Sequence, residues 1–407
     1  MKARFLGGAS RVGSLGLLLE DDGYRHLFDY GITPADPPLF PSEAPEIDAL
    51  FLTHAHVDHS GAIPWLCEHQ RPEIYATPPT VQTGLILMED TIKVAEAEGH
   101  HIPFGRAGIK NARNLFRTVE YGDTIDAGGA EVTVHDAGHI PGAAMYEVVG
   151  HETILFTGDI HTIETNLAKA AKPVSCDTLI IESTYAGRRH PDRLRTEHAL
   201  VEKVRRVADR GGLAIIPAFA LGRTQELMIA LMHSRLATWV DGMGKRITGT
   251  YLDMPHYLRR PKLLRAAHRK IKPVRNFGER RKAMRADAVI TTSGMLDGGP
   301  VLTYLDEKKY DDRSAVLLTG YQVEGTNGRL LLEERRVDFY GVRQEIACEV
   351  EYFDLSAHAD HHQLLRFIDA CDPRRVVLMH GDSRQALAND LKGYEVLMPM
   401  EGEEFEL

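Results

Sequence analysis

The sequence has few cysteines and no long apolar run. The four cysteines (Cys67, Cys176, Cys348 and Cys371) are too few and too scattered for a disulfide framework, and no C-x-x-C pair indicates a structural zinc. No apolar stretch approaches the ~20 residues that are needed to span a bilayer. The first residues also lack the apolar core of a secretory signal. These absences favour a cytoplasmic globular protein, and 407 residues are enough for two domains of ordinary size.

Acidic residues outnumber basic ones, so the formal net charge is −10, but the basic residues are concentrated in one segment. Residues 256–285 contain twelve Lys or Arg and a single acid, Glu279, which makes this segment +11 and the rest of the chain −21. A basic face on an acidic body can bind phosphate groups locally and discourage indiscriminate binding elsewhere. The alternative is a solvated helix face without a ligand.

An H-x-H-x-D-H cluster follows the apolar run 48–53, which has the composition of a buried strand. His54 and His56 are two residues apart and can face the same ion. Asp58 and His59 lie beyond the bend and can face a second ion. Imidazole and carboxylate groups together suit zinc or a similar divalent metal. The alternative is a polar, His-rich turn with no ligand role.

Other short apolar strands are also followed by candidate ligands, and a glycine lies close in sequence to most of these ligands. The strands predicted at 26–28, 132–135, 153–156 and 375–379 precede, in that order, Asp29, His139, Asp159 and His380. Glycine lets the backbone approach closely at such places. Ligands gathered at the carboxyl ends of strands are typical of an α/β active site. One such residue alone usually has a structural role, but several that follow the ends of different strands indicate a shared site.

The pattern changes after residue 185, where buried strands at 213–217, 288–292 and 315–319 alternate with helices. This alternation predicts a parallel, doubly wound layer. The candidate metal ligands stop at Asp159 and resume only at His358 and His380, so we expect a second α/β domain inserted into the first. The predicted boundaries are 1–185 for the first part of the outer domain, 186–355 for the insertion and 356–407 for the return.

These motifs resemble those of the metallo-β-lactamase superfamily, and a further set is similar to its β-CASP branch of RNA- and DNA-processing nucleases. The segments similar to β-CASP motifs A, B and C are Ile181–Tyr185, Ser356–Asp360 and Met379–Gly381. Flanking signatures occur at 219–226, 292–300 and 320–326. The resemblance extends to the nuclease subunit of the cleavage and polyadenylation specificity factor and to its short archaeal and bacterial homologues. It implies a metallo-β-lactamase αββα sandwich with an inserted β-CASP α/β domain.

The resemblance also implies two zinc ions per chain. His54, His56 and His139 would hold one ion, Asp58, His59 and His380 would hold the other, and Asp159 would bridge them. Such a pair of ions polarises a phosphoryl oxygen and lowers the pKa of bound water. Asp29 would lie behind the ligands and orient a histidine.

A proton for the leaving 3′-oxygen is expected from His358, hydrogen-bonded to Glu182, because the resemblance implies this pair near the scissile phosphate. The alternative for His358 is a capping or core histidine. Glu182 ends a buried strand, so it requires a partner in any case.

No RRM aromatics, helix-turn-helix or basic zipper is found in the sequence, so base reading is not expected. The weaker candidates for contacts with an RNA backbone are Arg223, Ser293, Gly294, Gly325 and Thr326. The expected function is a zinc-dependent ribonuclease of RNA 3′-end processing or decay, acting on single-stranded RNA. Internal cleavage, 5′–3′ exonuclease action and a homodimer all stay open, as do two rivals: a DNA nuclease of the same family and an inactive RNA-binding scaffold. Relatives that act on DNA generally carry an aliphatic residue where this chain has His380.

Overall fold

The computed structural model describes residues 1–35 and 37–407, which form two compact units. Unit 1 comprises Met1–Glu164, Lys169–Arg189 and His358–Leu407, and unit 2 comprises Thr165–Ala168 and His190–Ala357. The chain therefore leaves unit 1 for a long insertion and then returns to it. The unit boundaries lie a few residues beyond 185 and 355, and the sequence did not predict the short excursion of residues 165–168.

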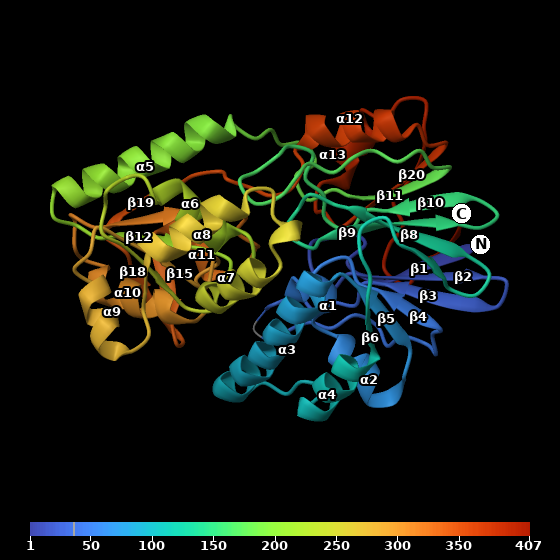
Figure 1. The fold of residues 1–407 in the computed structure, drawn as a ribbon, viewed down its shortest axis with the longest axis horizontal. Helices are drawn as coiled ribbons and strands as arrows, with labels where there is room; N and C mark the ends of the chain where they lie inside the picture. Colours follow the sequence, from blue (N-terminus) through green and yellow to red (C-terminus); the bar gives the residue numbers. More distant parts are fainter. Residues whose placement is uncertain (36) are drawn as a thin grey trace. The chain divides into compact units, whose positions relative to one another are not determined.

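Unit 1 is built on two seven-stranded sheets, and the first has the order β22-β1-β2-β3-β4-β5-β6 (Figure 1). Its strands are β1 (Lys2–Gly7), β2 (Gly16–Asp21), β3 (Tyr24–Phe28), β4 (Ala49–Phe51), β5 (Glu73–Ala76), β6 (Phe116–Thr118) and β22 (Glu404–Glu406). The second sheet has the order β21-β20-β11-β10-β9-β8-β7. Its strands are β7 (Thr124–Asp126), β8 (Glu131–Asp136), β9 (Ala144–Val149), β10 (Thr153–Phe156), β11 (Thr178–Glu182), β20 (Arg375–Met379) and β21 (Glu395–Leu397).

The two sheets of unit 1 pack face to face around a core of large apolar side chains. Phe28 and Phe51 of the first sheet meet Tyr146 and Phe156 of the second, and the ring centroids of Phe28 and Phe156 are 5.2 Å apart. Each fully buried side chain of this kind stabilises the fold by roughly 1.5–3 kcal/mol relative to an exposed one.

Helices cover the outer faces of both sheets (Figure 1). On the first sheet these are α1 (Val57–Ser60), α2 (Ile63–His69), α3 (Pro78–Glu98) and α4 (Arg106–Leu115), and on the second α12 (His361–Cys371) and α13 (Arg384–Ala388). This arrangement confirms the αββα sandwich that the sequence predicts.

Unit 2 contains a six-stranded sheet whose neighbouring strands are all parallel, as the sequence predicts. Its order is β14-β13-β15-β12-β16-β19, built from β12 (Ala214–Pro217), β13 (Thr238–Asp241), β14 (Lys272–Pro273), β15 (Ala288–Thr291), β16 (Ala315–Leu318) and β19 (Glu349–Tyr352). The helices are α5 (Arg193–Asp209), α6 (Arg223–Leu231), α7 (Gly244–Asp253), the short 3₁₀ helix η1 (Pro255–Tyr257), α8 (Pro261–Lys270), α9 (Phe277–Ala283), α10 (Pro300–Lys308) and α11 (Asn327–Glu334). A hairpin of β17 (Arg336–Phe339) and β18 (Val342–Glu345) completes the unit.

One core of unit 2 lies between the sheet and helices α9 to α11. Ile215, Val289 and Val316 of the strands pack there with Leu305 and Leu331 of the helices. Helix α5 contacts strand β12, helix α6 contacts strand β15, and the two helices contact each other. Among the helices of the described residues, none combines the length and apolar character needed to cross a membrane.

Candidate active site

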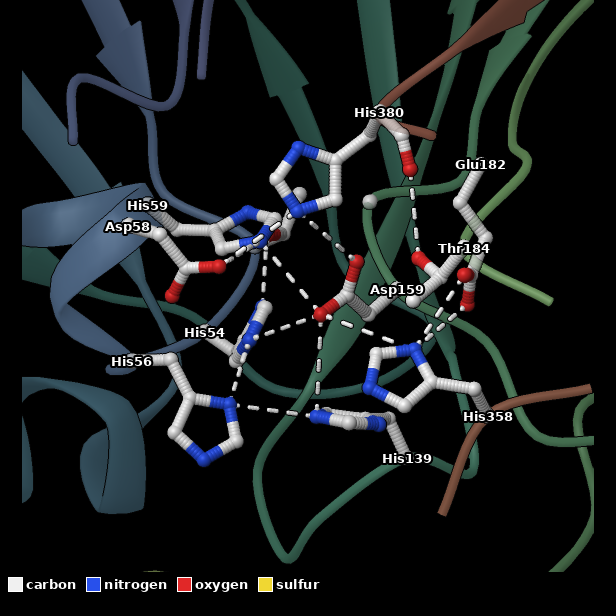
Figure 2. A network of polar contacts seen from close by, with 12 residues as sticks. His54, His56, Asp58, His59, His139, Asp159, Glu182, Thr184, His358 and His380 are labelled. Atoms are coloured by element: carbon white, nitrogen blue, oxygen red, sulfur yellow. Dashed lines mark hydrogen bonds and ion pairs between the residues drawn. The ribbon is translucent and has the colours of Figure 1, made fainter. Parts of the chain in front are cut away.

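The candidate metal ligands of unit 1 converge on one place, although they come from distant parts of the chain (Figure 2). His54 and His56 follow β4, whereas Asp58 and His59 belong to α1. His139 lies between β8 and β9, Asp159 follows β10, and His380 follows β20. Strands from both sheets of unit 1 therefore place the residues that follow their carboxyl ends at one common site, which is where an α/β active site is expected.

The first group consists of His54, His56, His139 and Asp159. The Nδ1 atom of His56 is 2.9 Å from Nε2 of His54 and 3.2 Å from Nε2 of His139. The Asp159 Oδ2 atom is 3.4 Å from Nε2 of His54 and 3.8 Å from Nε2 of His139. These four ligand atoms form a compact set that could hold a metal ion.

The second group consists of Asp58, His59 and His380. The Asp58 Oδ2 atom is 3.7 Å from Nε2 of His59 and 3.4 Å from Nε2 of His380. Asp159 adjoins this group as well, since its Oδ2 is 3.4 Å from Nε2 of His59 and its Oδ1 is 3.9 Å from Nε2 of His380. Asp159 is therefore the carboxylate shared by the two groups.

Spacing and hydrogen bonding both fit cations at these positions. Ligands about 2.0–2.1 Å from a tetrahedral zinc ion stand roughly 3.3 Å apart, close to the separations of the ligand atoms here. The Nε2 atoms of His59 and His380 and the Oδ1 atom of Asp159 are buried and have no hydrogen-bond partner among the described residues. Buried polar atoms without partners destabilise a fold by about 1–3 kcal/mol each, and a metal ion would satisfy all three.

The charge state of the histidines also suits metal binding. Burial lowers the pKa of His56 to about 4, and burial together with the neighbouring His59 lowers that of His54 well below its usual value. Both rings are therefore neutral at pH 7 and offer a lone pair. Burial acts in the same direction on His59, but the carboxylates of Asp159, Asp58 and Asp29 outweigh it and raise the pKa of His59 well above its usual value. The carboxylates thus attract positive charge to this place.

Asp29 and Thr53 hold the candidate ligands His54 and His59 in place through hydrogen bonds. One Asp29 oxygen accepts a hydrogen bond from the backbone N–H of Thr53 (2.7 Å). The other is 2.7 Å from Nδ1 of His59 and accepts from the Thr53 hydroxyl (2.8 Å). The Thr53 oxygen is also 3.1 Å from Nδ1 of His54. These contacts fix the ring orientation that points each Nε2 at the site.

The ligand loops rely on unusual backbone positions. Asp29 and His380 have φ angles of 57° and 52°, in the left-handed region that costs energy for residues other than glycine. Gly31 lies against the backbone of the H-x-H-x-D-H loop, and a Cβ atom there would be 1.7 Å from the carbonyl oxygen of Asp58. Gly31, two residues after Asp29, is therefore needed for close approach, as the sequence indicated.

Glu182 and His358 form a pair at the margin of the ligand cluster. The Nδ1 atom of His358 is 3.1 Å from both Glu182 oxygens, and Glu182 also accepts from the backbone N–H of Ile160 (2.8 Å). Figure 2 shows the other ring nitrogen of His358 turned away from Glu182 and toward the cluster. Burial lowers the pKa of His358, but Glu182 and Asp159 outweigh it and raise this pKa to about 9.

The weaker RNA-contact candidates all lie in unit 2, in the loops at the carboxyl ends of its parallel strands or at the start of α6. Arg223 and Thr326 are 7% and 6% exposed, which leaves them little surface for a ligand. The Thr326 hydroxyl caps α11, and that of Ser293 accepts from the backbone N–H of Asp297. Gly294 is buried and Gly325 is exposed. An RNA contact at these residues stays a prediction.

Two supporting residues were not identified from the sequence. Thr53 touches both Asp29 and His54, and its only signal was its place directly before the first histidine of the motif. Thr184 donates from its hydroxyl to the backbone carbonyl of His380 (3.2 Å) and so anchors that ligand. It lies within the motif A segment, where only Glu182 was given a role.

Three family models match the chain. Residues 11–206 match the metallo-β-lactamase superfamily, residues 224–331 match the β-CASP domain, and residues 343–399 match the Zn-dependent metallo-hydrolase RNA specificity domain.

Curated relatives align along nearly the whole chain. A probable RNase, MJ4, of Methanocaldococcus jannaschii is 33% identical, and the alignment covers all of both chains. RNase aCSPSF2 of Saccharolobus solfataricus is 32% identical over 99% of this chain and 85% of its own length. Subunit 3 of the cleavage and polyadenylation specificity factor of Dictyostelium discoideum is 31% identical over 97% of this chain and 56% of its own length. A solved structure of a protein of unknown function from Enterococcus faecalis V583 shares the fold, with a TM-score of 0.61, 15% identity and coverage of 100% and 99%.

Proposed function

The chain belongs to the β-CASP branch of the metallo-β-lactamase superfamily, and from this membership we propose that it is a zinc-dependent ribonuclease that hydrolyses phosphodiester bonds in RNA 3′-end processing or decay. The observation that carries the proposal is the convergence of seven ligand side chains on two adjacent groups, with the Glu182–His358 pair beside them. RNase-named relatives and the matched RNA specificity domain support RNA as the substrate.

We assign one zinc ion to His54, His56 and His139 and a second to Asp58, His59 and His380, with Asp159 shared between them. When bound, such ions supply Lewis-acid activation of a phosphoryl oxygen and of a water nucleophile. The protein residues fix the positions of the ligands: Thr53 and Asp29 orient His54 and His59, and Thr184 anchors the backbone of His380.

The role of general acid falls to His358. Its Nδ1 atom is held by Glu182, so the proton on its other ring nitrogen is available to a leaving 3′-oxygen. Because Glu182 and Asp159 outweigh burial and raise the pKa of His358 to about 9, the ring carries that proton at neutral pH. Bound cations lower the pKa of His358, so in the metal-loaded enzyme this pKa lies closer to neutral pH.

We place single-stranded RNA against the basic segment 256–285 of unit 2. Its exposed cations include Arg265 and Arg269 on α8, four residues apart and so on one helical face. Two arginines of the segment have structural roles instead. The Arg259 side chain donates to the carbonyl of Thr165 (2.9 Å), and Arg280 is paired with the buried Asp241 (2.7 Å).

A DNA nuclease of the same family is the second candidate. His380 favours RNA as the substrate, because relatives that act on DNA generally carry an aliphatic residue at this position. The proposal also includes a cytoplasmic location and a homodimer. The test uses end-labelled single-stranded RNA and the matching DNA, each with a 5′ monophosphate or triphosphate. Cleavage of RNA with DNA left intact is expected, and product sizes distinguish internal from 5′–3′ cleavage. Preferential cleavage of DNA would contradict the proposal.

A further inference from the structure

The chain passes between the two units four times, at 164/165, 168/169, 189/190 and 357/358. The last passage ends at His358, the proposed general acid. On the side of unit 1, the residues after His358 are held tightly: the backbone N–H of Ala359 donates to the carbonyl of Ile160 (2.8 Å), and that of His361 donates to the carbonyl of Arg188 (3.0 Å).

On the side of unit 2, the residues before His358 are held by Arg193, the first residue of α5. Its Nη1 atom donates to the carbonyl of Ser356 (2.9 Å) and to that of Leu355 (3.3 Å). A second tie lies beside it, where Nδ1 of His190 is 2.7 Å from a carboxylate oxygen of Asp354. Arg193 thus joins the segment that enters unit 2 to the segment that leaves it.

The guanidinium of Arg193 is itself held by two carboxylates. Its Nε atom is 3.2 Å from Glu197 on α5, and its Nη2 atom is 3.6 Å from Glu226 on α6. The other oxygen of Glu226 accepts from the backbone N–H of Leu167 (2.8 Å), which belongs to the short excursion 165–168. Within unit 2, the Arg193–Glu226 pair therefore holds all three segments that run to and from unit 1.

We propose that Arg193 is a positioning residue for His358: by holding the carbonyls of Leu355 and Ser356, it restrains the backbone that leads directly into His358, whose ring is paired with Glu182. This inference rests on the proposed function, because it assigns Arg193 a part in proton delivery. Glu226, which lies in the flanking signature 219–226, holds the Arg193 side chain in place, and none of its hydrogen-bond and ion-pair partners among the described residues is a candidate metal ligand.

The chain offers a matched control on the same helix. Lys203 of α5 is 15% exposed, close to the 16% of Arg193, and it too is paired with two carboxylates, Glu349 and Glu351. It contacts none of the segments that pass between the units among its hydrogen-bond and ion-pair partners in the described residues. Arg193→Ala and Lys203→Ala therefore remove similar ion pairs from α5, but only the first loosens the segment before His358.

The experiment measures single-turnover RNA cleavage, RNA dissociation constant, metal content and melting temperature for the full chain. Arg193→Ala is expected to lower the cleavage rate about 10- to 100-fold, the size of effect that a misplaced catalytic group produces, with metal content and RNA affinity unchanged. Lys203→Ala is expected to cleave at close to the wild-type rate. Arg193→Lys keeps the charge but loses the planar guanidinium, so its cleavage rate should lie between those of Arg193→Ala and Lys203→Ala.

A double-mutant cycle with His358→Ala separates positioning from general structural support. If Arg193 acts through His358, adding Arg193→Ala to His358→Ala lowers the rate by less than about twofold. Equal losses in both backgrounds, or an equal loss in Lys203→Ala, would overturn the positioning role while leaving the ribonuclease proposal intact. Wild-type protein that cleaves no RNA would overturn the ribonuclease proposal itself and this inference with it.

Discussion

Replacing Glu182 by Gln removes the negative charge beside His358 and keeps a side chain of nearly the same size and shape. The glutamine carbonyl can still accept from the backbone N–H of Ile160, which now donates to Glu182 over 2.8 Å. The change therefore tests whether the carboxylate keeps His358 protonated, as the proposed general acid must be.

The expected loss of activity depends on pH. With the pKa of His358 raised to about 9 by Glu182 and Asp159 against the opposing effect of burial, about 90% of the rings are protonated at pH 8. If the pKa returns to its ordinary 6.5, about 3% remain protonated, so the rate falls roughly 30-fold. At pH 6 both forms are mostly protonated and the rates differ by less than about twofold. Bound cations lower the pKa of His358 in both proteins. The pH range in which the two rates differ therefore moves to lower pH, and the variant still loses activity at a lower pH than the wild type.

The assay is single-turnover cleavage of a labelled RNA between pH 5.5 and 9.5 for both proteins, with metal content measured in parallel. The wild-type rate should hold to a higher pH than the variant rate, and above its own pKa the variant should lose about tenfold per pH unit. Parallel pH profiles would refute the assignment of His358 as an acid tuned by Glu182. A loss of metal in the variant would show that Glu182 supports the ligands instead.

Three other substitutions test separate parts of the account. His358→Ala should keep its metal and its RNA affinity but lose about 10²–10⁴-fold in turnover, measured by single-turnover cleavage. Gly31→Ala should lower the melting temperature and weaken metal binding, since its Cβ would be 1.7 Å from the Asp58 carbonyl oxygen and overpacking costs about 1–3 kcal/mol or more. Charge reversal at Arg265 and Arg269 should weaken RNA binding for all sequences and reduce the log–log salt slope by about 0.7 per lost phosphate contact.

Each of these changes has a control or a contradicting outcome. Loss of zinc in His358→Ala would make it a ligand and not an acid. Gly249→Ala lies in the middle of α7, where the added Cβ meets nothing within 4 Å, so it should not lower the melting temperature and should raise it slightly because alanine favours the helix. Charge reversal at Arg106 and Arg113, both exposed on α4, should not alter the salt slope, and equal slopes for all proteins would mean that RNA does not bind the basic segment.

The fold and the ligand cluster were predictable because both depend on short-range sequence patterns. The strands that end at 156 and 379 were predicted with the bounds that β10 and β20 have, since apolar runs broken by glycine mark such strands clearly. Helix ends were less predictable. Helix α6, for example, ends at Leu231, and residues 232–236 form a turn followed by irregular backbone that the composition of this stretch does not reveal.

Long-range side-chain contacts were not predictable. Arg259 and Arg260 were equivalent members of a basic run in the sequence, yet Arg259 holds the carbonyl of Thr165. Arg280 likewise pairs with Asp241, which is distant in sequence and buried at the end of β13. Pairs that join residues tens of positions apart depend on how the sheets and helices assemble, so no local pattern marks them. The links from Arg193 to residues 355 and 356 belong to the same class.

The central claim is that the seven ligands hold two zinc ions and that Asp159 is shared by both. Metal analysis of protein purified without added metal, combined with RNA cleavage by the same samples, tests it most directly. The wild-type protein should contain close to two zinc equivalents per chain, and Asp159→Ala should lose cleavage and disturb the binding of both ions. Fully active protein with a single equivalent of metal, or an active Asp159→Ala variant, would contradict the claim.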